Sequence, residues 1–71
     1  MISPSDIENW FTYHSPTKEQ QEAYVQLRLS AQALAGTICA LTPPSADQTA
    51  AIRKLRECVM TANAAIACGG K

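Results

Sequence analysis

Two apolar stripes with helical spacing, separated by adjacent prolines, constrain the fold of this chain more than any other feature. Their apolar residues recur three and four positions apart: Tyr24, Leu27, Ala31, Leu34, Ile38 and Leu41, then Ile52, Leu55, Val59, Ala62 and Ile66. This heptad spacing places each set on one face of an α-helix. Pro43 and Pro44 cannot continue the first helix. The sequence therefore predicts two long helices that fold back on each other as an antiparallel αα-hairpin.

Residues that cap helices mark the ends of this hairpin. Thr17 with Gln20 forms a T-x-x-Q box, and Ser45 with Gln48 forms an S-x-x-Q box. A pair of glycines at positions 69 and 70 closes the last helix. These signals predict helices over about residues 17–41 and 45–68.

A short helix precedes the hairpin. Ser3 can cap it, Pro4 suits its first position, and Asp6 lies near its positive end. We expect this helix over about residues 4–12. Ser15, which is followed by a proline, is an alternative start for the helix after it. The predicted fold class is all-α, a short N-terminal helix and then the long hairpin.

The chain is small enough that this fold needs further support. Its 71 residues make one domain at most, and short chains bury a small fraction of their surface. Its three cysteines are odd in number and form no C-x-x-C pair, so they indicate neither a disulfide framework nor a zinc site. Apolar residues also lie off the stripes, at Val25, Leu29 and Met60. We therefore expect the subunits to assemble into a homo-oligomer.

Charge and motifs narrow the function classes. Six basic and six acidic residues cancel, which argues against binding of DNA or RNA polymers through a basic field. No apolar run approaches the ~20 residues that span a bilayer, and no basic segment with an apolar core begins the chain. We expect a cytoplasmic protein. With one histidine and no catalytic or metal-binding motif, the chain is expected to be no enzyme and to hold no cofactor or metal.

Three of the four aromatic residues gather in the segment NWFTYHSP, residues 9–16. Trp10 and Phe11 are expected to cover the hairpin as a lid, because large aromatic side chains dominate small cores. Tyr13 and His14 come just before Pro16, which fixes a bend. For Tyr13, a place in the core and a role as a stacking platform for a nucleobase remain equal alternatives.

Polar residues on the long helices have two readings each. Arg28 lies at the edge of the first stripe, either as a flank residue with a solvated head or as a guanidinium that binds phosphate between subunits. The cations Arg53, Lys54 and Arg56 form a solvated face, or they pair with Glu19 or Glu22 at the acidic start of the second helix on the antiparallel neighbour. Asn63 lies among alanines, where its amide either sets the helix register or reads a base edge.

Several blocks of the sequence resemble a known family. The blocks are YHSPTKEQ, AYVQLR, LAGTI, PPSADQTAAIRKL and VMTANAAIAC, which together cover roughly residues 9–68. They resemble the hairpin domain of the bacteriophage anti-CBASS cyclic-nucleotide sponges, of the anti-CBASS protein 2 type. The resemblance implies a helical subunit in a compact hexamer without enzymatic activity. It also implies sequestration of the cyclic di- and trinucleotide signals of CBASS immunity in the host cytoplasm, so that the effector stays inactive.

The same resemblance implies the site residues. Tyr13 looks like the family's stacking tyrosine, and Arg28 falls where the family offers a basic residue to phosphate. His14 and Lys18 lie in the matched YHSPTKEQ block, and Asn63 lies in the ANAAIA block. The sequence departs from the family pattern at three positions of the third helix, where an acidic residue, a tryptophan and an arginine are common: Arg56, Thr61 and Cys68. The resemblance therefore does not extend to a second ligand site there.

A different function class stays open beside the sponge. Val25, Leu29 and Met60 would also suit a small helical adaptor that binds another protein through exposed apolar side chains. Such a module would be a monomer or dimer with free apolar surface.

Overall fold

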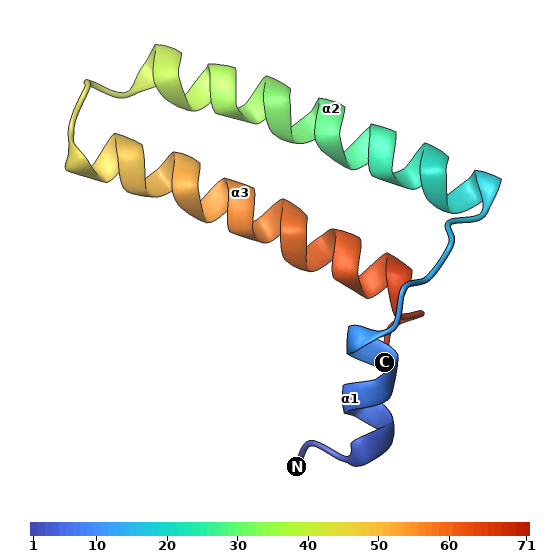
Figure 1. Cartoon of the computed structure of the whole chain (residues 1–71). Coiled ribbons are helices and arrows are strands. Elements are labelled where there is room, and N and C mark those ends of the chain that lie inside the picture. Colours follow the sequence, from blue (N-terminus) through green and yellow to red (C-terminus); the bar gives the residue numbers. More distant parts are fainter.

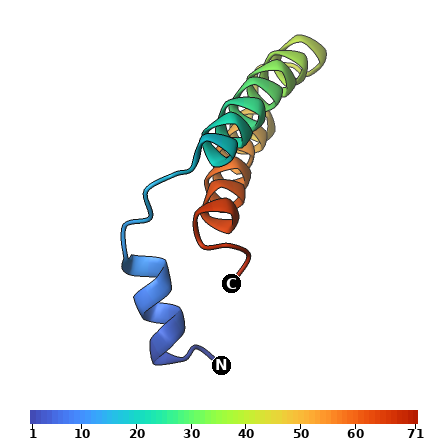
Figure 2. The ribbon, with the colours of Figure 1, turned by 90° about the vertical axis from the view of Figure 1, so that its right-hand side faces the viewer.

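The computed structural model describes residues 1–71. It contains three α-helices: α1 (Pro4–Phe11), α2 (Lys18–Leu41) and α3 (Ala46–Ala67). Helices α2 and α3 run side by side in opposite directions, and α1 stands beyond the open end of this hairpin (Figure 1). Both chain termini lie at that end, as the rotated view also shows (Figure 2). The all-α class predicted from the sequence is confirmed. None of the helices has the length and apolarity needed to cross a membrane.

The capping box of α2 forms as predicted. Thr17 Oγ1 accepts from the Gln20 amide at 3.1 Å, and Gln20 Oε1 accepts from the Thr17 amide at 2.9 Å. The helix thus begins after Thr17 and not at Ser15. The first two observed helices differ from the expected ranges by one residue at one end, and α3 differs by one residue at both ends, because cap residues such as Ser45 and Cys68 lie just outside the helical hydrogen-bond ladder.

Only one of the two hydrogen bonds of the capping box predicted at the start of α3 is formed. Ser45 Oγ accepts from the Gln48 amide at 3.1 Å, but the Gln48 side chain does not return to Ser45. Its Nε2 instead donates to the Thr42 carbonyl at 3.1 Å. The tight proline turn brings this orphan carbonyl of α2 within reach, so the Gln48 amide closes the turn between the two helices.

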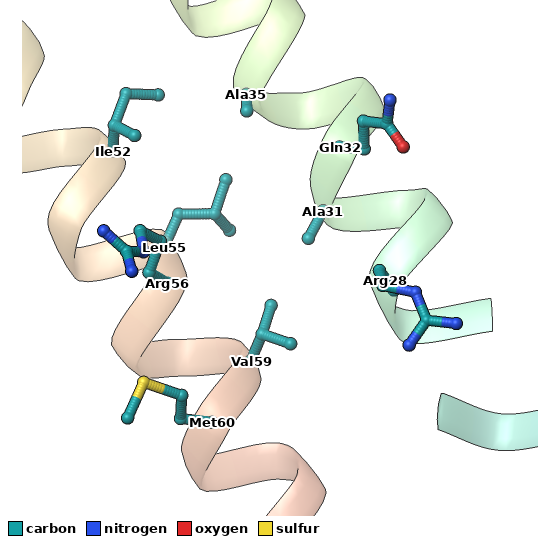
Figure 3. A pocket seen from close by; sticks show the side chains of 9 residues that line it. All are labelled: Arg28, Ala31, Gln32, Ala35, Ile52, Leu55, Arg56, Val59 and Met60. Carbon is teal, nitrogen blue, oxygen red and sulfur yellow. The ribbon is translucent and has the colours of Figure 1, made fainter. Parts of the chain in front are cut away.

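Small residues on α2 let α3 approach closely. Leu55 and Val59 point from α3 toward Ala31 and Ala35 of α2 (Figure 3). Ala35 is half-buried there, whereas Leu34, which the heptad spacing placed on this face, is 49% exposed. A straight helix has 3.6 residues per turn and drifts from a 3.5-residue repeat, so the contact face moves to the next residue.

The two helices form an interface but no enclosed core. At the open end, Gln20 Nε2 donates to the Ile66 carbonyl at 3.2 Å and fixes the register. No side chain of the chain is fully buried, and large apolar ones stay exposed, among them Leu29 at 59% and Met60 at 66%. Most of the stabilisation of a folded domain comes from apolar burial. The stability of a hairpin that packs against no other subunit is marginal, so the homo-oligomer remains the prediction.

Gly36 offers a stability test of α2. It lies in the middle of the helix, and a Cβ atom added there would meet nothing within 4 Å. Glycine in a helix interior costs about 0.5–1 kcal/mol relative to alanine. Gly36→Ala is therefore expected to raise the free energy of unfolding by about that amount in urea denaturation followed by circular dichroism.

Gly69→Ala is the matched control for this experiment. Gly69 has φ of 66°, a conformation that alanine adopts only with strain, so this change should lower the free energy of unfolding. A loss of stability in Gly36→Ala would contradict the open surroundings of Gly36 and would mean that a second copy approaches α2 there.

Candidate functional site

Polar groups tie α1 to the C-terminal end of the chain. Asn9 Nδ2 donates to the Cys68 carbonyl at 3.3 Å, and Trp10 Nε1 donates to the Lys71 carbonyl at 2.9 Å. Ser5 and Asp6 line a hollow on the same side of α1, opposite the C-terminal residues. Helix α1 thus turns a polar face toward its own hairpin.

The predicted lid over the hairpin is wrong within a single chain. Phe11 is 84% exposed and Trp10 is 42% exposed. The reason is the connecting segment 12–17, which carries α1 past the end of the hairpin (Figure 1). Neither ring lines the groove between α2 and α3. Trp10 does anchor α1, because its indole N–H donates to the Lys71 carbonyl.

Tyr13 and His14 differ in how firmly they are held. The Asn9 carbonyl accepts a hydrogen bond from His14 Nε2 at 2.7 Å, and His14 is half-buried. Tyr13, its neighbour, is 83% exposed. The pair therefore combines an anchored residue with a free aromatic ring, which suits stacking on a planar ligand.

A groove of about 450 Å³ runs between α2 and α3 on one face of the hairpin. Apolar side chains form its floor: Ala31, Ala35, Ile52, Leu55, Val59 and Met60. Arg28 of α2 and Arg56 of α3 stand at its rims, and no carboxylate lines it. The Arg28 guanidinium extends away from α3 (Figure 3). The groove therefore suits an occupant that is apolar on one side and carries negative charge at its edge.

Arg56 is the residue whose place the sequence pattern left undecided. It shares the groove with Arg28, whereas Arg53 and Lys54 do not line it. The signal was present, because Arg56 follows Ile52 by four positions and so lies at the edge of the α3 stripe.

The pairing of this basic run with the start of α2 does not form within one chain. The Gln20–Ile66 hydrogen bond sets the helices so that Glu19 and Glu22 lie opposite the C-terminal end of α3. Arg53 lies near the N-terminal end of α3, at the other end of the hairpin.

Three of the five expected site residues line different hollows: Arg28, Lys18 and His14. Lys18 begins α2, and Arg28 follows about 15 Å further along the helix axis. Lys18 lines a separate shallow hollow on α2, and Tyr13 is not among the residues of the groove. Within one chain, Tyr13 and Arg28 therefore do not line the same groove.

Asn63 leaves one polar atom without a partner. Its Oδ1 is shielded from solvent and accepts no hydrogen bond, although the residue as a whole is only half-buried. An unpaired acceptor of this kind costs about 1–3 kcal/mol. Within one chain this oxygen does not set the register of the hairpin.

No three histidine, cysteine, aspartate or glutamate side chains come together as a metal site. All three cysteines are free thiols.

Comparison with known proteins gives one match. The family described as the Acb2/Tad1 hairpin domain matches residues 3–67, which is nearly the whole chain. Searches of curated proteins and of solved structures gave no match.

Proposed function

The chain belongs to the Acb2/Tad1 hairpin-domain family of anti-CBASS sponges, and from this premise we propose that it binds cyclic oligonucleotide signals and holds them without cleaving them. The family match over residues 3–67 carries this proposal. It includes both the segment with the exposed Tyr13 and the helix with Arg28, so the two groups that suit a nucleotide lie inside the matched domain.

A cyclic dinucleotide has two bases and two phosphates, and a pocket between two copies offers each protein group twice. Tyr13 stacks on a base, because its exposed ring can lie flat against the π-face of the base. Arg28 meets a phosphate, for which its guanidinium supplies two parallel N–H donors. Lys18 adds positive charge, His14 holds the segment that carries Tyr13, and Asn63 offers an amide to the base or to a neighbouring subunit.

Sequestration works by mass action. A protein that binds the signal tightly and in excess lowers its free concentration below what the effector needs. The proposal includes a homo-oligomer, a hexamer by analogy with the family, that acts in the host cytoplasm where the signals are made. The missing core of the single chain supports such an assembly, because a closed oligomer covers the apolar side chains that one hairpin leaves exposed.

Calorimetry against a panel of cyclic di- and trinucleotides tests the proposal. We expect at least one to bind, and chromatography of the denatured complex to return it chemically intact. A protein that binds none of the panel at micromolar concentration would refute the sponge. Recovery of a linear or hydrolysed nucleotide would show an enzyme instead.

Substitutions at the two principal residues test the site. Tyr13→Ala removes a stacking ring worth about 1–3 kcal/mol per base, so the dissociation constant should rise roughly 5- to 150-fold. Tyr13→Phe keeps the ring and should bind nearly as the parent does. Arg28→Ala should also weaken binding, whereas Lys54→Ala, which removes a cation that lines neither the groove nor the hollow on α2, should not.

Each variant is compared with the parent by light scattering. Unchanged mass separates loss of a ligand contact from loss of the oligomer. Normal affinity in Tyr13→Ala would remove that residue from the site.

A helical adaptor is the alternative that the exposed side chains favour. Val25 is 43% exposed, and Leu29 and Met60 are more so. A monomer that binds no cyclic nucleotide in the panel would support this function over the sponge.

A further inference from the structure

Helix α1 presents an apolar face that its own chain covers only in part. Ile7, Trp10 and Phe11 are spaced three and four residues apart, which places them on one side of the helix. Ile7 is 51% exposed, and the two rings are exposed as well. The opposite side, with Asn9, faces the chain's own C-terminal residues. An amphipathic helix with its apolar face outward lacks the partner that this pattern requires.

The groove between α2 and α3 has the complementary chemistry. Its floor is apolar, and its only charged side chains are Arg28 and Arg56. Helix α1 carries Asp6 and Glu8 and no cation. Asp6 is engaged in the helix cap, where its carboxylate accepts from the Ser3 amide at 2.9 Å. Glu8 is exposed beside the apolar face and is free to meet an arginine.

The dimensions also agree. Helix α1 has 8 residues and is about 12 Å long. The residues of α2 that line the groove run from Arg28 to Ala35, about 11 Å along that helix. The hydrogen bonds to Cys68 and Lys71 hold α1 at the end of its own hairpin, away from its own groove.

We propose that α1 of one copy docks its Ile7, Trp10 and Phe11 face into the α2–α3 groove of a second copy. Glu8 then lies near the arginines at the rim. Tyr13 follows Phe11 by two residues, so docking brings the ring of one copy toward Arg28 of the other. This inference rests on the proposed oligomer and not on ligand binding, and it names the surface that joins the copies.

Trp10 is the only tryptophan, so its fluorescence reports directly on the docked face. The experiment compares the emission maximum and the light-scattering mass of the full chain, without nucleotide, over a dilution series. The parent protein should show blue-shifted emission when assembled. Phe11→Ser should raise the concentration of half-dissociation about tenfold or more, with a red shift, because a large apolar side chain loses its covered site.

Leu41→Ser is the matched control for Phe11→Ser. Leu41 is 79% exposed, close to the 84% of Phe11, but it ends α2 at the far tip of the hairpin. It should leave both the mass and the emission unchanged. Equal loss of assembly in Leu41→Ser and Phe11→Ser would overturn the proposal, because the effect would then follow from general apolar exposure.

Charge reversal tests the orientation of the docked helix. Arg56→Glu and Glu8→Arg should each weaken assembly, and the double variant should recover at least part of it, since the pair is then restored with opposite signs. Lys54→Glu makes the same charge change as Arg56→Glu on a residue outside the groove and should assemble as the parent does.

Three outcomes of the dilution series with the parent protein also overturn the docking. A high mass with red-shifted Trp10 emission means that the copies join elsewhere, which leaves the proposed oligomer intact. Blue-shifted emission with the mass of a monomer means that α1 packs on its own chain. A red-shifted monomer at every concentration refutes both the docking and the oligomer, while the nucleotide panel remains a separate test of ligand binding.

Discussion

The contact between α2 and α3 is the interaction on which the rest of this structure depends. Alanines at positions 31 and 35 let Leu55 and Val59 come close (Figure 3). One side-chain amide at each end fixes the register, Gln20 at the Ile66 carbonyl and Gln48 at the Thr42 carbonyl. This register sets Arg28 and Arg56 on the same face, with the apolar floor of the groove between them. The groove is thus a consequence of small residues in the seam, which leave space beside them.

Local patterns in the sequence predicted the parts of the fold that depend on neighbouring residues. The helices and the caps at Ser3 and Thr17 follow from groups three or four positions apart, so spacing alone specifies them. The exposure of Leu34 was not predicted, because a heptad template ignores the drift of a straight helix. The outward turn of α1 was beyond such reasoning, since it depends on a hydrogen bond between Asn9 and Cys68, 59 residues apart.

The sequence predicted which residues belong to the candidate site but not how they are arranged in space. Sequence blocks pointed to Tyr13 and Arg28, and the structure leaves the first exposed in a connecting segment and the second at a groove rim. Periodicity within one chain carries no information on how copies meet, so it could not say whether the two residues converge. Arg56 shows the converse: it was grouped with a charged run, although its spacing of four from Ile52 already sets it apart from Arg53 and Lys54, and it alone of the three lines the groove.

A chain without an enclosed core links its stability to its function. On the proposed arrangement, the surface that covers the apolar face of α1 is also the one that brings Tyr13 of one copy toward Arg28 of another. A ligand held by both copies then binds the assembled state and not the separated chains, so it stabilises the assembly by the free energy of its binding. The converse follows from the same linkage: whatever weakens the docking of α1 lowers the affinity for the ligand, even where it touches neither the base nor the phosphate. In such a protein the marginal core of the single hairpin is the reason that folding, assembly and binding form one equilibrium.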